Sequence, residues 1–208
     1  MRKVVLWIGA VAALGWSSVA GANLIVNGDF ESGNIGFTTA YQLPVGCCAE
    51  GSYAITTDPQ LMHGGAEPYG DHSTGSGLMM VANGSTIANT LLWSQTVSVV
   101  PNTDYVFSAY VSSWWLGSPA ELDLRMETMG SVVSTFTAPT QTALWQKWSV
   151  ILNSGASGSF NINIVNRNIA AFANDFAIDD ISFSAIPEPS TALLLGIGLA
   201  GIAARRRV

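Results

Sequence analysis

Short runs of alternating apolar and polar residues recur along the middle of the chain and predict β-strands. The clearest run lies between Glu121 and Glu127, where Leu122, Leu124 and Met126 alternate with charged residues. A period of two places one face of a strand in the core and the other in solvent. Runs that fit the same pattern occupy residues 24–26, 53–57, 78–82, 93–99, 105–111, 148–152 and 160–164. Eight or more such strands, separated by turn residues, predict an all-β antiparallel β-sandwich of the jelly-roll type.

The final strand of this series changes phase. Phe176 and Ile178 share one face, whereas Ile181 and Phe183 have the other parity. One extra residue at Asp179 and Asp180 brings all four apolar side chains to one face, which is what a β-bulge does. The alternative is that the strand ends on two solvated aspartates.

The first 22 residues have the pattern of a secretory signal peptide. Arg2 and Lys3 precede an apolar run from Val4 to Trp16, and small residues follow up to Ala22. The apolar run is too short for a comfortable membrane span. We therefore expect export and cleavage after Ala22, with a retained membrane anchor as the alternative.

The opposite end combines a structure-breaking triplet, an apolar segment and a basic cluster. Pro187, Glu188 and Pro189 precede the apolar residues 191–204, and Arg205, Arg206 and Arg207 follow. A helix of that length spans roughly 21 Å, against about 30 Å of membrane hydrocarbon. The pattern therefore predicts a marginal inner-membrane anchor with its arginines on the cytoplasmic side.

Charge is distributed unevenly along the chain. Only 11% of the residues are charged, and residues 23–186 contain three basic and thirteen acidic side chains. Phosphate backbones repel such a domain, so nucleic acid is excluded as a partner. A cation such as calcium, or a neutral sugar, is compatible with it.

The C-terminal arrangement resembles the PEP-CTERM sorting signal of Gram-negative bacteria. The Pro187-Glu188-Pro189 triplet, the apolar segment and the arginine cluster occur in the order typical of that family. The resemblance implies recognition by an exosortase-type enzyme and removal of the tail. It also implies release or attachment at the cell surface, in an exopolysaccharide or biofilm matrix.

A second resemblance concerns the two ends of the predicted sandwich. Residues 23–31 and 174–183 are similar to the first and last strands of galactose-binding-like jelly rolls, a group that includes carbohydrate-binding modules. In that group the two strands lie side by side and often hold a structural calcium ion. Carried over by position, the ligands are Glu31 and Asp180, with Asp29 as a weaker candidate. Calcium takes six to eight oxygens, so other groups must complete the site.

Two sets of residues have the types found in catalytic sites. Asp71, His72 and Ser73 are triad residue types, but their adjacency does not give triad geometry, so a structural loop is the preferred interpretation. Glu121, Asp123 and Glu127 share a strand face and could supply the two carboxylates of a glycosidase. A solvated outer face is the commoner role of such a pattern.

Cys47 and Cys48 are the only cysteines, and they are adjacent. In an exported protein they predict a strained vicinal disulfide, although free thiols or an intermolecular bridge remain open.

Exposed aromatic residues are candidates for stacking against sugar rings. Trp114 and Trp115 follow a predicted strand and precede a loop, where consecutive side chains point in opposite directions. Tyr69 in a glycine-rich loop is a third candidate. Amide side chains that could bind sugar hydroxyls are Asn161, Asn163 and Gln95.

The sequence thus predicts a signal peptide at 1–22, a β-sandwich at 23–186 and a sorting segment at 187–208. The leading hypothesis is an exported, non-catalytic surface or matrix protein that binds carbohydrate. The alternatives are a purely structural or adhesive protein without a small ligand, and a glycoside-active enzyme.

Overall fold

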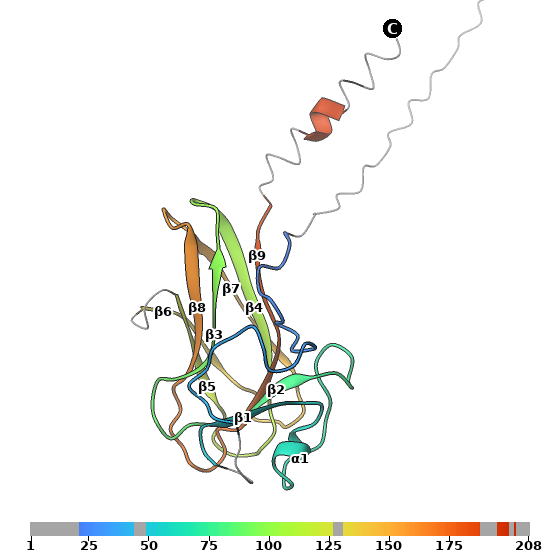
Figure 1. Cartoon of the computed structure of the whole chain (residues 1–208), viewed down its shortest axis with the longest axis vertical. Helices are drawn as coiled ribbons and strands as arrows, with labels where there is room; N and C mark the ends of the chain where they lie inside the picture. The colour runs from blue at the N-terminus through green and yellow to red at the C-terminus, as the bar shows by residue number, and fades with distance from the viewer. Residues whose placement is uncertain (1–20, 44–48, 127–130, 188–194, 200–201, 203–208) are drawn as a thin grey trace, which may run out of the picture. The chain divides into compact units, whose positions relative to one another are not determined.

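The computed structural model describes residues 21–43, 49–126, 131–187, 195–199 and 202. Residues 21–186 form one compact unit, a sandwich of two antiparallel sheets (Figure 1). The second unit contributes few described residues. They include a short helix at 195–199, whose residues are exposed. In the described part of the chain, no helix has the length and apolar character needed to cross a membrane.

The larger sheet has five strands in the spatial order β1-β2-β9-β4-β7. The smaller sheet has four in the order β3-β8-β5-β6. A single turn of helix, α1, spans Pro59–Met62 and is capped by the Asp58 side chain. The strands are β1 (Ser52–Thr56), β2 (Met79–Asn83), β3 (Thr90–Ser98), β4 (Asp104–Ser113), β5 (Glu121–Met126), β6 (Ser131–Thr137), β7 (Gln146–Asn153), β8 (Ser159–Asn166) and β9 (Phe176–Ala185).

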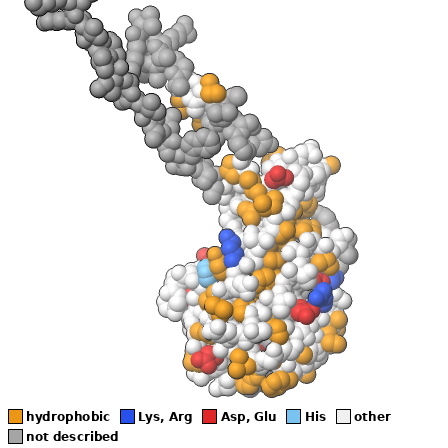
Figure 2. Space-filling view, turned by 180° about the vertical axis from the view of Figure 1, so that it is seen from behind, with side chains coloured by type: hydrophobic (Ala, Val, Ile, Leu, Met, Phe, Trp, Pro, Cys, Tyr) orange, Lys and Arg blue, Asp and Glu red, His pale blue; other side chains and the backbone are white. Residues whose placement is uncertain are grey.

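The core lies between the two sheets, and its residues follow the predicted alternation. On β5, Leu122, Leu124 and Met126 are buried, and the same holds for every second residue of β4 and β8. The all-β sandwich predicted from the sequence is therefore confirmed. Figure 2 shows one face of the molecule, on which hydrophobic side chains are common and charged side chains are few.

The predicted bulge in the last strand is present. The register between β4 and β9 shifts between Ser108 and Tyr110, and Asp180 has a φ of 49°. Two residues of β9 therefore face one residue of β4, which returns Ile181 to the core side. Asp179, directly before the shift, is fully buried, whereas Asp180 is half-buried.

The predicted strand at residues 24–26 is wrong in one respect. The segment lies beside β9, with the Leu24 amide donating to the Phe183 carbonyl (2.8 Å) and the Ile181 amide donating to Gly28 (2.9 Å). It does not form a regular strand, because Asn27 and Phe30 adopt positive φ values and turn the chain away. The two ends of the domain are nevertheless hydrogen-bonded to each other.

Several sequence predictions lie outside the described residues. They are the signal peptide up to residue 20, the Cys47–Cys48 disulfide, Glu127, and the sorting residues Glu188, Pro189 and Arg205 to Arg207. Pro187 directly follows the sandwich and is exposed.

The segment that opens the domain approaches β9 so closely at Gly28 that a side chain there should destabilise the fold. A Cβ atom on Gly28 would lie 2.0 Å from the Ile181 carbonyl oxygen, and backbone atoms cannot move aside cheaply. We expect Gly28→Ala to lower the free energy of unfolding by about 2 kcal/mol. Urea denaturation measures this change. Gly158→Ala is the control, because no atom lies within 4 Å of its added Cβ; equal effects of the two substitutions would contradict the prediction.

Candidate functional site

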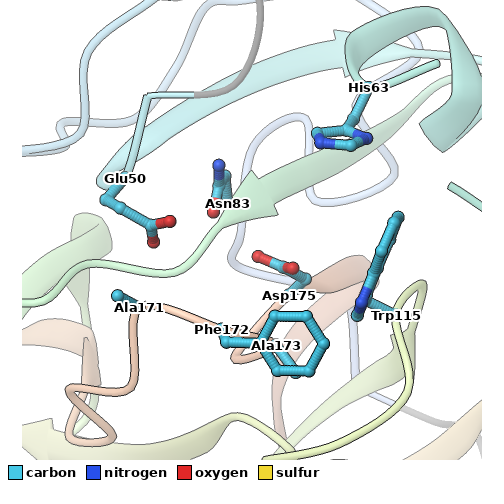
Figure 3. Close-up of a pocket in the computed structure, with 8 residues that line it drawn as sticks. All are labelled: Glu50, His63, Asn83, Trp115, Ala171, Phe172, Ala173 and Asp175. Carbon is cyan, nitrogen blue, oxygen red and sulfur yellow. The ribbon is translucent and has the colours of Figure 1, made fainter. Parts of the chain in front are cut away.

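An open pocket lies where loops meet at one end of the sandwich (Figure 3). About 380 Å³ of space, part of it open solvent, lies between its walls. Its walls come from the residues before β1, after α1, at the end of β2, after β4 and before β9. The lining residues are Glu50, His63, Asn83, Trp115, Ala171, Phe172, Ala173 and Asp175.

Aromatic rings form one side of this pocket. The Trp115 ring lies with its centroid 5.2 Å from His63 and 6.5 Å from Phe172, in edge-to-face arrangements. Trp115 is half-buried and Phe172 is 70% exposed. Neighbouring rings therefore hold Trp115 in place while part of its surface stays open to the pocket.

Two carboxylates also line the pocket, Asp175 beside the aromatic rings and Glu50 across from them (Figure 3). In Figure 3 the side chains of Glu50 and Asp175 point into the space around Asn83. Burial is the main cause that raises the pKa of Asp175 to about 6. Burial, followed by the charge of Asp175, also raises the pKa of Glu50. The charge of Asp175 therefore reaches Glu50 and disfavours its ionisation.

Close backbone packing positions Asp175. Its carboxylate accepts a hydrogen bond from the Gly84 amide (3.3 Å). Gly84 lies so close to Asn174 that an added Cβ would fall 2.1 Å from the Asn174 carbonyl oxygen. Ala173 and Asn174 both have positive φ values, which are uncommon for residues other than glycine. The chain thus adopts a sparsely populated conformation next to the pocket, a feature that clusters at functional sites.

Of the three aromatic residues predicted to bind sugar, only Trp115 lines the pocket. Trp114 is 1% exposed, and its indole N–H donates to the carbonyls of Ala82 and Phe176, both at 3.1 Å. Trp114 therefore packs under the loops and offers no free ring face. Tyr69 is half-buried against Trp145, at a ring distance of 5.9 Å, and lies outside the pocket.

The predicted calcium ligands make hydrogen bonds within the protein. One Glu31 oxygen accepts from the Leu78 amide (2.8 Å), and Asp180 accepts from Ser73 (2.8 Å) and contacts His72 Nδ1 (2.6 Å). Asp29 is exposed. Among the described residues, no three His, Cys, Asp or Glu side chains are grouped as metal ligands would be.

The loop of residues 70–78 has the structural role favoured by the sequence. Although burial acts to raise the pKa of Asp71, hydrogen bonds from Thr74 and Gly77 lower it. The Asp71 carboxylate therefore stabilises the loop to which it belongs, by accepting hydrogen bonds from that loop's own amides. The carboxylate partner of His72 is Asp180, 108 residues away. Ser73 bonds to the same aspartate, so the three neighbours do not make a nucleophile triad.

The carboxylates on β5 are paired with arginines. Asp123 is 1% exposed and bonds to Arg125 (3.0 Å), whereas Glu121 bonds to Arg167 (2.7 Å). The expectation that these carboxylates lie on a solvated strand face is therefore wrong for Asp123. Neither carboxylate lines the pocket.

The amide side chains predicted to bind sugar also lie outside the pocket. Gln95 bonds to the backbone of Val26, and Asn161 accepts from Ser94 (2.8 Å). Asn163 is buried on β8. These amides stabilise the sandwich.

Sequence reasoning missed most of the pocket. Glu50, His63, Asn83 and Phe172 stand in four separate segments with no shared motif. Asp175 was included only as part of residues 174–183, which resemble the last strand of galactose-binding-like jelly rolls. The loop conformations that bring these residues together depend on contacts far apart in the sequence.

The buried Asp179 and the half-buried Asp175 predict how stability depends on pH. Burial is the main cause that raises the pKa of Asp179 to about 7, as it raises that of Asp175 to about 6. Both values exceed the unfolded value of about 3.9, so the folded state binds more protons between about pH 4 and 7. We expect the free energy of unfolding to rise as the pH falls from 8 to 5, and Asp175→Asn to reduce that rise. Urea denaturation at each pH measures it; an unchanged slope in the variant would count against the assignment.

Comparison with known proteins identifies the tail of the chain. Residues 185–207 match the PEP-CTERM protein-sorting motif. No curated protein matches the chain.

Solved structures with a similar fold include a cyclase and carbohydrate-binding modules. The Stig cyclase Fisc from Fischerella sp. TAU has 13% identity and a TM-score of 0.56, covering 81% of this chain and 98% of its own. TmCBM61, solved with β-1,4-galactotriose, has 14% identity and a TM-score of 0.50, with 79% and 99% covered. The CBM22-1–CBM22-2 tandem of Paenibacillus barcinonensis Xyn10C has 17% identity and a TM-score of 0.50, with 83% and 49% covered.

The TM-scores show that the fold is shared. At such low sequence identity the similarity says nothing about ligands. The chain therefore carries a PEP-CTERM protein-sorting motif, preceded by a jelly-roll domain whose fold also occurs in carbohydrate-binding modules.

Proposed function

We propose that this protein is an exported, non-catalytic surface protein that binds carbohydrate in the pocket lined by Trp115. The observation that carries the proposal is the pairing of a partly open tryptophan ring with polar groups across the same space. Sugar rings offer apolar C–H faces that stack on aromatic rings. Their hydroxyl groups can donate hydrogen bonds to the carboxylates of Glu50 and Asp175 and to the Asn83 side chain.

The position of the pocket suits a protein that is attached through its tail. Asp175 directly precedes β9, and the sorting motif begins at the last residue of that strand. A strand of ten residues spans roughly 30 Å. The pocket and the attachment point therefore lie at opposite ends of the same strand, and attachment at one end leaves the other accessible.

The sorting motif supports the other parts of the proposal. An exosortase-type enzyme recognises the tail, residues 191–204 hold the chain in the inner membrane before processing, and the domain then reaches the cell surface or matrix. A polysaccharide of that matrix is the proposed ligand. A purely adhesive role without a small ligand is the alternative, and it leaves the pocket unused.

Catalysis has less support, although cyclases share this fold. The pocket does contain a carboxyl group that can exchange a proton near neutral pH, Asp175. Glu50 is the second carboxyl group of the pocket, whereas the β5 carboxylates considered for a glycosidase are paired with arginines outside it. Turnover of a polysaccharide panel by the purified protein would contradict the non-catalytic assignment.

Two adjacent tryptophans provide a matched test of the pocket. We expect Trp115→Ala to weaken glycan binding at least tenfold, about 1.4 kcal/mol, while the protein stays folded. In contrast, Trp114→Ala removes a buried ring and should lower the free energy of unfolding by about 3–5 kcal/mol. A glycan array and urea denaturation measure the two effects. Failure of the wild-type protein to bind any glycan would overturn the proposal.

Calcium at Glu31 and Asp180 stays a prediction from the resemblance. The charge around the 70–78 loop supports it, because Glu31, Asp71, Asp179 and Asp180 all bond to that loop. Binding would require His72 and Ser73 to release Asp180. If the ion is present, chelation with EDTA lowers the melting midpoint, and Glu31→Gln removes the response whereas Glu67→Gln keeps it. An unchanged midpoint, with no ion in the purified protein, removes the site.

A further inference from the structure

The pocket combines aromatic rings with two carboxylates. The rings of Trp115 and Phe172 lie on one side, and the carboxylates of Glu50 and Asp175 extend toward the centre (Figure 3). None of its eight lining residues, all of them described, is a lysine or an arginine. His63 is the one basic residue among the eight, and its ring packs edge-to-face against Trp115, with centroids 5.2 Å apart.

The two carboxylates differ in burial, because Glu50 is exposed and Asp175 is half-buried. The Asp175 carboxylate accepts a hydrogen bond from the Gly84 amide at a long 3.3 Å. Burial, and for Glu50 the charge of Asp175, disfavours ionisation. A ligand that brings a positive charge between them removes this repulsion and adds charge-assisted hydrogen bonds.

We propose that the pocket selects sugars with a free, protonated amino group. The ring of such a sugar lies against Trp115, and its ammonium group lies between the carboxylates of Glu50 and Asp175. This inference rests on the proposed function, because it assigns the ligand class of the same pocket.

Other sugars satisfy the pocket less well. A neutral sugar can donate hydroxyl hydrogen bonds but leaves two negative charges uncompensated. A uronic acid adds a third carboxylate and is repelled. An N-acetylated amino sugar has an amide in place of the ammonium group, so it loses the charge while keeping the ring that stacks on Trp115.

The preference should depend on pH. The titratable groups around Asp175 are Glu50 from the segment before β1, His63 after α1, and Tyr41. Burial raises the pKa of Tyr41 to about 12, so its hydroxyl remains neutral. Asp175, with a pKa of about 6, ionises as the pH rises, and an amine with a pKa near that of an α-amino group, about 8, loses its charge above it. Binding should therefore be tightest between about pH 6 and 8.

Three tetrasaccharides with the same β-1,4-linked backbone test the proposal. They carry an ammonium, an N-acetyl or a hydroxyl group at C2: the tetramers of glucosamine, N-acetylglucosamine and glucose. Calorimetry with the full chain at pH 6.5 measures the three affinities. We expect the glucosamine tetramer to bind about tenfold more tightly than the others, and Asp175→Asn and Glu50→Gln each to remove most of that preference.

Two control variants distinguish binding in the pocket from a general attraction of a cationic sugar to an acidic protein. Glu67→Gln removes an exposed carboxylate that does not line the pocket and should keep the preference. Trp115→Ala should weaken all binding. Equal affinity for the three tetramers, an equal loss in Glu67→Gln, or no binding of the glucosamine tetramer would overturn the amino-sugar assignment. The proposed function itself survives these results if another glycan binds and Trp115→Ala abolishes that binding, and it falls if no glycan binds.

Discussion

The pairing of β9 on both of its edges is the constraint on which the rest of the structure depends. β9 lies between β2 and β4, and the segment that opens the domain also hydrogen-bonds to it. Its apolar residues fill the core, and its bulge keeps them there despite an extra residue. Asp175 directly precedes β9, Asp179 and Asp180 lie in its middle, and the sorting motif starts at its end. One strand therefore connects the pocket, the 70–78 loop and the tail.

The carboxylates along this strand differ because their surroundings differ. Asp180 is half-buried and bonds to His72 and Ser73. Asp179 is buried and receives two backbone amides, yet burial still raises its pKa. Asp175 combines partial burial with access to a pocket, so its charge is available to a ligand at a cost in stability. Proteins tolerate such a cost mainly where function requires it.

Packing explains why two adjacent tryptophans have opposite roles. On an extended chain, neighbouring side chains point to opposite sides. Trp114 points under the loops, where its N–H finds two carbonyl acceptors, and Trp115 points toward Phe172 and the pocket. The sequence predicted that the two rings point in opposite directions. It could not show which of them is buried, because that depends on the loop of residues 171–175.

The sequence by itself determined those features that depend on the pattern of neighbouring residues. Alternation on β4, β5 and β8 gave the sheets, the parity change in β9 gave the bulge, and the Pro-Glu-Pro triplet with its apolar and arginine segments gave the sorting motif. Tertiary structure alone decided the partner of His72, the burial of Asp123 and the membership of the pocket. The physical reason is distance along the sequence. Strand periodicity and the Pro-Glu-Pro triplet can be recognised within a few neighbouring residues, whereas these contacts join distant segments that only the folded sandwich brings together.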